Sequence, residues 1–206
     1  GTPVRGDFFV YTRKEARDRL GFTEDRPMLL SYWGSLGAKV MNGYTAELIL
    51  RENDLGAPYR HIHGAGRDFA SMTQDLAQAG MLACPGVEVR EYIFDMPLVM
   101  AAADLVLCRS GASTISELAA IAQPAVLVPS PNVTADHQTK NAKILSESGG
   151  AVLLPESECS GEKLYEVVSG LLADEPRRQE MSRSLSRLAV TDANERIYET
   201  LKGLLR

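Results

Sequence analysis

The fold of this 206-residue chain is decided by the stretch Asp104-Leu105-Val106-Leu107-Cys108-Arg109-Ser110-Gly111 and by the residues that follow it. The run 104–108 predicts a buried strand, and 114–121 predicts a helix close behind it. A strand that passes through a glycine-containing turn into a helix is a unit of α/β folds. The turn aims the unpaired N–H groups of the helix start at whatever lies above the strand end, and Arg109 adds positive charge there. Anions bind favourably at such a helix N-terminus, and a nucleotide diphosphate is the expected ligand.

The same alternation of strands and helices extends in both directions from this stretch. Further strands are predicted at 28–33, 59–63, 87–92, 125–128 and 151–154, and further helices at 38–52, 68–80, 136–145, 161–173, 176–189 and 193–205, with a short helix after Asp95. Asp95 and Asp136 are expected to cap the helices that they precede. Crossovers of this length are right-handed and give a parallel sheet with helices on both faces. We therefore expect an α/β domain with a Rossmann-like doubly wound parallel sheet, with ligands bound beyond the carboxyl ends of its strands.

Composition narrows the class of protein. Hydrophobic residues make up 45% of the chain, enough for a sizeable core, and the net charge of -5 with scattered basic residues argues against a nucleic-acid partner. The three cysteines, Cys84, Cys108 and Cys159, form no paired or zinc-like pattern, which favours a reducing, cytoplasmic setting. The sequence contains no signal peptide and no apolar run of membrane-spanning length, so any membrane contact is expected to be peripheral. A chain that begins at Gly1 without methionine is expected to be part of a longer protein.

Two turns at predicted strand ends carry groups suited to phosphate and ribose. Gly34-Ser35-Leu36-Gly37 lets the backbone approach a phosphate closely and offers the Ser35 hydroxyl, although an ordinary strand-to-helix turn explains the same residues. Glu117 lies about one turn into the helix after Gly111, where its carboxylate can accept two hydrogen bonds from a ribose diol. The alternative is a capping box, because Thr114 and Glu117 have the required spacing.

A third polar group opens the helix at Asp136-His137-Gln138-Thr139-Lys140-Asn141. Gln138 and Asn141 share one helical face near a strand end, so they either bond the hydroxyls of a sugar or are solvated residues behind an Asp136 cap.

The remaining candidates are less specific. His61 and His63 share one face of a strand but have no third ligand for a metal, so we interpret them as ordinary strand residues. Trp33 and the run 92–94 are typical of a core, and Ile93 at a strand exit can offer its backbone groups to a planar base.

Five short motifs occur in a fixed order along nearly the whole chain: Gly1-Thr2-Pro3-Val4-Arg5, Gly34-Ser35-Leu36-Gly37-Ala38, Tyr92-Ile93-Phe94-Asp95-Met96, 108–117 and 136–142. Together they resemble the C-terminal half of the MurG family, the peptidoglycan glycosyltransferases that add N-acetylglucosamine to lipid I. The resemblance implies one half of a GT-B fold. Residues 1–206 would form the C-terminal nucleotide-sugar (donor) binding domain, with 193–206 a terminal helix that packs toward an N-terminal domain outside these residues.

The resemblance also assigns roles to individual residues. It implies that Arg5 and Ser35 contact the donor phosphates, that Ile93 holds uracil through its backbone, and that Gln138, with Asn141, binds the N-acetylglucosamine. It further implies that one run of residues wraps the diphosphate and ribose, and that Glu117 at its end binds the ribose hydroxyls. The run consists of Ala112, Ser113, Thr114, Ile115, Ser116 and Glu117. No metal or other cofactor is implied, because the chain has no Asp-x-Asp motif.

Two residues depart from the family pattern. Trp33 stands where the family usually has a second glycine, and Leu36 where it usually has glutamine. We expect Trp33 to narrow the first phosphate loop and Leu36 to remove a polar contact.

The implied activity is transfer of N-acetylglucosamine from UDP-GlcNAc to lipid I (undecaprenyl-diphospho-muramoylpentapeptide), with inversion, in peptidoglycan synthesis. The general base, the lipid acceptor site and the membrane-facing surface are implied to belong to the N-terminal half. The chain alone is therefore expected to bind donor without turnover, and the full-length protein to be peripheral on the cytoplasmic face of the cell membrane. Two alternatives are a non-catalytic nucleotide-sugar-binding subunit that needs a partner chain and one half of a UDP-GlcNAc 2-epimerase-like enzyme.

Overall fold

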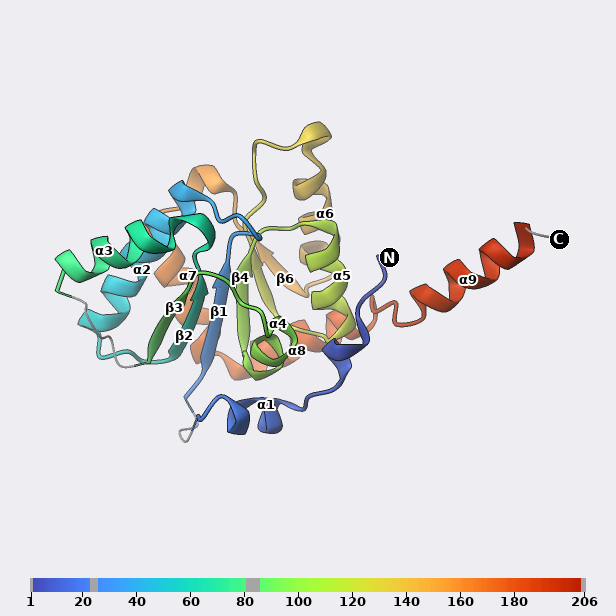
Figure 1. Cartoon of the computed structure of the whole chain (residues 1–206), viewed down its shortest axis with the longest axis horizontal. Helices are drawn as coiled ribbons and strands as arrows, with labels where there is room; N and C mark the ends of the chain where they lie inside the picture. The colour runs from blue at the N-terminus through green and yellow to red at the C-terminus, as the bar shows by residue number, and fades with distance from the viewer. Residues whose placement is uncertain (1, 23–25, 81–85, 205–206) are drawn as a thin grey trace.

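A computed structural model describes residues 2–22, 26–80 and 86–204, and its centre is a six-stranded parallel sheet (Figure 1). The strands are β1 (Met28–Tyr32), β2 (Arg60–Gly64), β3 (Val87–Arg90), β4 (Leu105–Cys108), β5 (Ala125–Leu127) and β6 (Ala151–Leu153). Their order in the sheet is β3-β2-β1-β4-β5-β6, so the direction of winding reverses between β1 and β4. The expected Rossmann-like doubly wound fold is confirmed, and its topological switch point lies at the carboxyl ends of β1 and β4.

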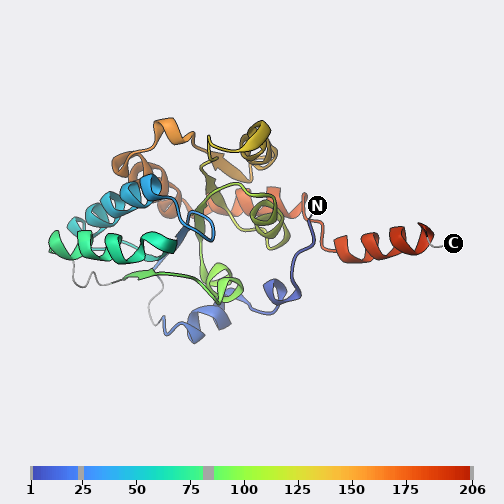
Figure 2. The ribbon, with the colours of Figure 1, turned by 45° about the horizontal axis from the view of Figure 1, so that its top comes forward.

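Helices cover both faces of the sheet, as Figures 1 and 2 show. One face packs against α1 (Arg13–Arg19), α4 (Met96–Ala102), α5 (Ala112–Ala120), α6 (His137–Glu147) and α8 (Glu175–Ser186), and the other against α2 (Lys39–Asp54) and α7 (Gly161–Ala173), with α3 (Phe69–Gln78) beside α2. Alternate side chains of each central strand point to opposite faces of the sheet. Leu30 and Val106 pack on the first face, and Leu29 and Leu105 pack on the second. Burial on both faces explains why these strands are continuous apolar runs.

The first part of the chain contains two elements that the sequence analysis did not predict. A 3-10 turn, η1 (Gly6–Phe9), and helix α1 place Phe8 and Ala16 in the core. Thr12 caps α1 by accepting from the backbone N–H of Glu15, whose side chain accepts from the N–H of Thr12 in return. The spacing of Thr12 and Glu15 is the sequence signature of a capping box, so this helix was detectable.

Asp104 ties α1 to the amino end of the sheet. Its carboxylate accepts from the backbone N–H of Met28 at 2.7 Å and from Arg13 Nε at 3.0 Å, and it forms a second ion pair with the buried Arg17. These bonds satisfy a carboxylate whose side chain is only 10% exposed, and they attach α1 to the first residue of β1.

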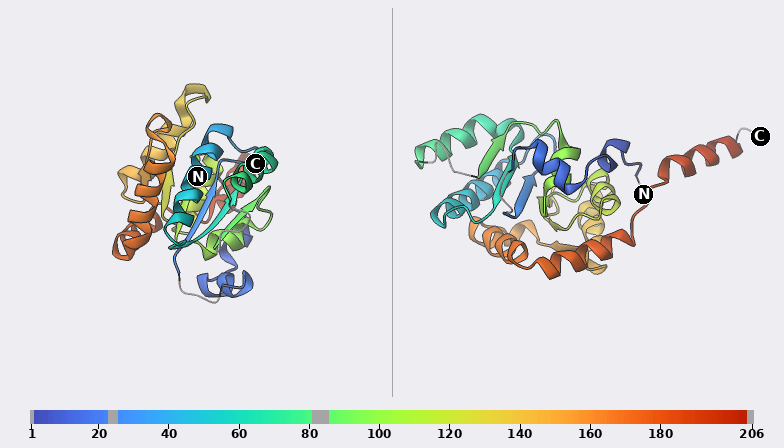
Figure 3. Two further views of the ribbon diagram at one scale, coloured as in Figure 1. Left: turned by 90° about the vertical axis from the view of Figure 1, so that its left-hand side faces the viewer. Right: turned by 90° about the horizontal axis from the view of Figure 1, so that it is seen from below.

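The last helix, α9 (Ala193–Leu204), extends away from the rest of the chain (Figures 1 and 3). Its exposed apolar side chains are Ile197, Tyr198, Leu201 and Leu204. Among the described residues, no helix combines the length and the apolar character that crossing a bilayer requires. Cys108 and Cys159 are free thiols in the interior. Gly1, Cys84 and residues 205–206 of the expected last helix lie outside the described residues.

Candidate functional site

A cavity of about 410 Å³ opens at the carboxyl ends of β1, β2 and β4, at the switch point of the sheet. Six of the residues predicted to bind a donor line it: Arg5, Ser35, Ile93, Ser113, Thr114 and Glu117. They come from the lead-in before α1, the turn after β1, the turn after β3 and the start of α5. The fold therefore gathers residues that are up to 112 positions apart in the sequence (5 to 117) around one hollow.

The first turn of α5 faces this cavity with its backbone donors. The helix begins at Ala112, two residues earlier than predicted, and its N-cap is Gly111, whose backbone is extended. Gly111 has no side chain that could accept from the first N–H groups, so these are available to an anion. The hydroxyls of Ser113 and Thr114 line the same wall.

Glu117 lies one turn further along α5, with its carboxyl half-buried in the cavity wall. Burial raises the pKa of this carboxyl above its ordinary value, while Arg5 nearby lowers it and Asp7 raises it. The capping-box alternative is wrong, because Thr114 is a residue of the first turn and not the N-cap. A desolvated carboxylate at a cavity wall is suited to accept hydrogen bonds from a diol.

Ile93 lines the cavity from the turn after β3. Its side chain is buried against Gly64, where a Cβ would lie 3.1 Å from Ile93 Cδ1. Tyr32 at the end of β1 also lines the cavity, and its buried hydroxyl lies toward Cys108, Thr114 and Glu117. Ile93 and Gly64 thus form an apolar wall against which a planar base can pack.

The turn after β1 is built by two glycines with left-handed backbone. Gly34 has φ +83° and Gly37 has φ +76°, and the N–H of Gly37 donates to the carbonyl of Gly34 at 3.3 Å. Ser35 between them faces the cavity, and Leu36 is exposed. The expectation that Trp33 narrows this turn is wrong: Trp33 is 3% exposed, packs in the core on the α2 and α7 side, and donates to Thr45 Oγ1.

Arg109 does not add free positive charge to this site, contrary to expectation. Its guanidinium donates to the carbonyls of Val128 and Pro129, both at 3.2 Å, and pairs with Glu156. The paired side chain also lies over the Trp33 ring. Arg109 therefore holds the turn after β5 in place, because its donors are used within the chain. Sequence spacing could not reveal these partners.

The polar group at 136–141 lies at the start of α6, beside the α5 terminus. The Gln138 carbonyl accepts from Ser110 Oγ at 2.8 Å, and Asn141 Nδ2 donates to the Ser110 carbonyl at 3.0 Å. Gln138 Oε1 accepts from the N–H of Ser130 at 2.9 Å, which leaves its amide nitrogen without a hydrogen bond among the described residues. Asp136 does not cap α6 as expected, because it has left-handed backbone at φ +53° and forms no capping bond. Asp95 likewise pairs with Arg90 instead of capping α4.

Three further predicted residues lie on α5 outside the cavity lining. Ala112 is exposed at the helix start, and Ile115 packs against the core. Ser116 Oγ accepts from the N–H of Thr2 at 3.2 Å, which attaches the lead-in to α5. Gln138 is also outside the lining, one helix away.

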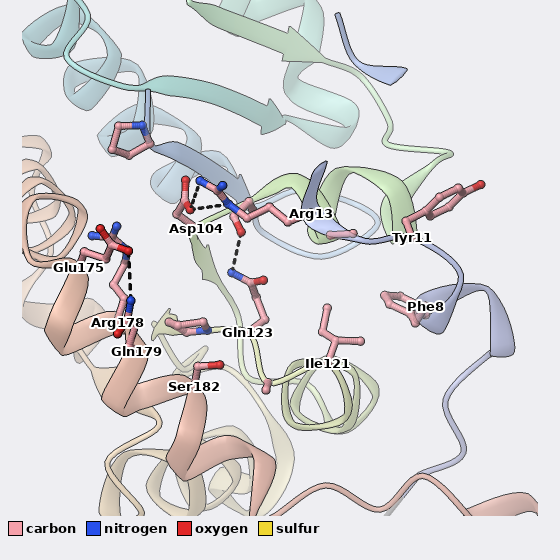
Figure 4. Close-up of a pocket in the computed structure, with 15 residues that line it drawn as sticks. Phe8, Tyr11, Arg13, Asp104, Ile121, Gln123, Glu175, Arg178, Gln179 and Ser182 are labelled. Carbon is pink, nitrogen blue, oxygen red and sulfur yellow. Dashed lines mark hydrogen bonds and ion pairs between the residues drawn. The ribbon is translucent and has the colours of Figure 1, made fainter. Parts of the chain in front are cut away.

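A second cavity, of about 590 Å³, lies at the amino ends of the strands, on the side of the sheet opposite the switch point. Figure 4 shows that several polar side chains in it have partners within the chain: Arg13 pairs with Asp104, Gln179 donates to Glu175, and Gln123 donates to the Ala103 carbonyl. These side chains already have partners within the chain, so they are less available to a ligand than the N–H groups at the α5 terminus.

Comparison with known proteins agrees with this geometry. Residues 32–197 match the glycosyltransferase family 28 C-terminal domain. The chain belongs to that family. The matched range contains the turn after β1, the α5 terminus and the start of α6, and therefore most of the candidate site.

Several curated proteins that are similar to this chain share one name. The chain is 39% identical to the UDP-N-acetylglucosamine–N-acetylmuramyl-(pentapeptide) pyrophosphoryl-undecaprenol N-acetylglucosamine transferase of Acetivibrio thermocellus, over 100% of the chain and 55% of that protein. It also resembles the crystal structure of Acinetobacter baumannii MurG, with a TM-score of 0.75 and 28% identity over 97% of this chain and 55% of that one. The chain thus spans about half the length of the curated relatives that it matches. The GT-B half-fold and the MurG-type resemblance are confirmed.

A crystal structure of UDP-N-acetylglucosamine 2-epimerase from Neisseria meningitidis shares the fold of this chain. Its TM-score is 0.61 at 16% identity, over 93% of this chain and 48% of that one. This likeness concerns the fold alone, since one fold supports several chemistries.

The family 28 domain also has cavity residues that the sequence analysis missed. They are Phe8, Tyr32, Gly64, Gly66, Glu91, Tyr92 and Met96, together with Gly34 of the known turn. Gly64 and Gly66 had a detectable signal, because two glycines directly after a predicted strand mark a turn where backbone and ligand approach closely. Phe8 and Tyr32 had none, because apolar and aromatic residues are equally typical of a core.

Proposed function

We propose that this chain binds UDP-N-acetylglucosamine in the switch-point cavity, as the donor half of an inverting transferase that glycosylates lipid I in peptidoglycan synthesis. The observation that carries the proposal is the convergence of Arg5, Ser35, Ile93, Ser113, Thr114 and Glu117 on one cavity at the α5 terminus. The name of the relatives supports both the donor and the acceptor, and we assign acceptor binding to the other half.

The proposed pose follows the order of groups along the cavity. Uracil lies against the backbone of Ile93, and the ribose diol donates to the Glu117 carboxylate. The diphosphate then lies between Ser35, Arg5 and the first turn of α5, where N–H groups and hydroxyls meet its charge. The sugar extends toward Gln138, whose amide nitrogen is unused, with Asn141 fixing the Ser110 turn below it.

Transfer of the sugar requires the site to stabilise the negative charge that develops on UDP as it leaves. The acceptor hydroxyl attacks the anomeric carbon from the face opposite the diphosphate, and the bonding electron pair leaves with UDP. Charge therefore grows on the diphosphate oxygens, which in this pose lie beside the first turn of α5, where Ser113 and Thr114 line the cavity. Each preorganised donor of this kind is worth about 3–4 kcal/mol in the transition state. The proton of the acceptor passes to a base that we place in the N-terminal half.

The other half also supplies the acceptor site and the membrane contact in this proposal. Lipid I binds through the N-terminal half, and the whole protein acts peripherally at the cytoplasmic face of the membrane. Helix α9 is proposed to pack against that half, because Ile197, Leu201 and Leu204 form an exposed apolar stripe with helical spacing.

UDP and UDP-N-acetylglucosamine are expected to raise the melting temperature of this chain. A ligand at a hundred times its dissociation constant adds about 2.7 kcal/mol of stability, which is about 5–10 °C for a domain of this size. Differential scanning fluorimetry with ADP and GDP as controls should give clearly smaller shifts, since the purine bases do not match the Ile93 end. Equal shifts with all four nucleotides would show a general anion site and contradict the proposal.

The chain alone is expected to turn over neither lipid acceptor nor donor. A radiolabelled transfer assay with lipid I should give no product with the 206 residues and product with the full-length protein. Incubation with UDP-N-acetylglucosamine should yield no epimerised sugar nucleotide by anion-exchange chromatography. Transfer by the isolated chain would place the base within these residues, and epimerised product would favour the epimerase alternative.

A further inference from the structure

A line of hydrogen-bonded polar side chains crosses the core beneath the turn after β1. It consists of Glu52, His61, Ser31, His63 and Asn42, all of them buried, and we name it the polar ladder. The parallel register places Ser31 of β1 beside His63 of β2, and His61, two residues earlier, points to the same face. Oγ of Ser31 lies 2.6 Å from His61 Nε2 and 2.7 Å from His63 Nδ1.

The two ends of the ladder lie on α2. His61 Nδ1 is 3.0 Å from the Glu52 carboxylate, and His63 Nε2 is 3.1 Å from Asn42 Oδ1. The Asn42 amide nitrogen donates to the Ala65 carbonyl at 2.8 Å and to the Asp68 carboxylate at 2.9 Å. Because those two partners only accept, the orientation of the Asn42 amide is determined, and its oxygen must face His63.

The positions of the hydrogens determine which group donates and which accepts in the hydrogen bonds from Asn42 to His61. Asn42 Oδ1 accepts, so His63 carries its proton on Nε2, and burial lowers the pKa of His63 to about 3, which keeps the ring neutral. His63 Nδ1 is then bare and accepts from the hydroxyl of Ser31. Ser31 has one hydrogen to give, so His61 Nε2 must donate to Ser31 in turn.

The Asn42 end of the ladder supports the phosphate-facing turn. A Cβ on Gly37 would lie 2.4 Å from the Ala65 carbonyl oxygen and 3.3 Å from Asn42 Nδ2, so the turn rests directly on these groups. A Cβ on Gly66 would lie 2.5 Å from Gly37 N, and the N–H of Arg67 donates to the Leu36 carbonyl at 3.2 Å. The segment 64–67 is thus the wall against which the turn 34–37 lies.

We propose that Asn42, held by His63 through the polar ladder, is a positioning residue that sets the turn 34–37 for the donor phosphates, an inference that rests on the proposed function. Asn42 is 3% exposed and does not line the cavity, so it acts on a ligand only through the turn. At the uridine end, Ile93 contacts the wall 64–67 only through apolar packing on Gly64, and neither Ile93 nor Glu117 is hydrogen-bonded to the Asn42 amide. The ladder therefore governs the diphosphate part of recognition and not the nucleoside part.

The test compares uridine with UDP by isothermal titration calorimetry on the chain. Asn42→Ala should weaken UDP binding by about tenfold or more, the value of a lost hydrogen bond in a buried network, while uridine affinity changes less than about threefold. The matched control is Asn53→Ala, an exposed asparagine on the same helix, which should change neither affinity. Equal proportional losses for both ligands, or no loss for either, would overturn the inference. A parent chain that binds neither ligand would instead refute the proposed function.

A second pair of variants covers the case in which Asn42→Ala does not fold. His63→Gln keeps an amide donor at the position of Nε2, whereas His63→Leu fills the space without one. The preference for UDP over uridine should persist in His63→Gln and fall about tenfold in His63→Leu; equal preferences in the two would contradict the role of His63. In the parent, long-range ¹⁵N–¹H correlation spectra should place the His63 proton on Nε2, and a proton on Nδ1 would refute the ladder's direction.

Discussion

Glu117→Gln is expected to weaken UDP and uridine binding about a hundredfold while raising the melting temperature of the unliganded chain. The affinity falls because two hydrogen bonds from a diol to a carboxylate, each worth about 1.5–3 kcal/mol, become bonds to a neutral amide or are lost. The stability rises because burial raises the pKa of Glu117, which means that the ionised form is disfavoured in the fold. Calorimetry and thermal unfolding at neutral pH measure the two effects on one sample.

The raised pKa of Glu117 fixes the direction in which both the stability and the uridine affinity change with pH. A carboxyl whose folded pKa lies above its unfolded pKa contributes most to stability at low pH, and that contribution is lost as pH rises through the folded pKa. The gain in melting temperature of the variant should therefore be present at neutral pH and shrink as pH falls below the raised pKa. Uridine affinity of the parent should fall over the same pH range, because protons compete with the diol for the carboxylate, and the variant should lack this dependence.

The matched control for this prediction is Glu91→Gln. Glu91 lines the same cavity, but its side chain is exposed and makes no ion pair among the described residues. This variant should bind uridine as the parent does. Parent-like uridine binding by Glu117→Gln would remove this carboxylate as the ribose ligand.

Gly37→Ala is expected to destabilise the chain by about 2–4 kcal/mol, the sum of overpacking and left-handed backbone strain. The new Cβ would lie 2.4 Å from the Ala65 carbonyl oxygen, and the backbone there has φ +76°. Both groups are main chain, so relief requires that the turn move away from the wall 64–67. Urea unfolding with a global fit of midpoint and slope measures the loss.

Gly34→Ala separates the two causes, because Gly34 lies in the same turn with φ +83° but has open space where its Cβ would be. Only the backbone strain remains, so the expected loss is about 1 kcal/mol. If the two alanine variants unfold at the same urea concentration, the close contact of Gly37 with Ala65 does not support the turn.

Much of the fold could be predicted from local patterns. The helix Gly161–Ala173 has the predicted bounds, and all six strands lie within two residues of their predicted positions. Local signals suffice for these elements because apolar periodicity reports which side of a segment is buried. Helix α1 was not predicted, although Thr12 and Glu15 have the spacing of a capping box, because its residues do not show the apolar periodicity of a helix.

The sequence by itself determined the class of fold and the order of its motifs, because strand and helix preferences act over a few residues. Only the tertiary structure decided what those residues face. The sheet order brings the turns after β1 and β4 together with Arg5 and Ile93. Packing of the chain also buries Trp33 in the core and pairs Arg109 with Glu156. The register of β1 and β2 places Ser31 between two histidines. These contacts join segments separated by tens of residues. Their partners are selected by packing of the whole chain, which no local stretch of sequence encodes.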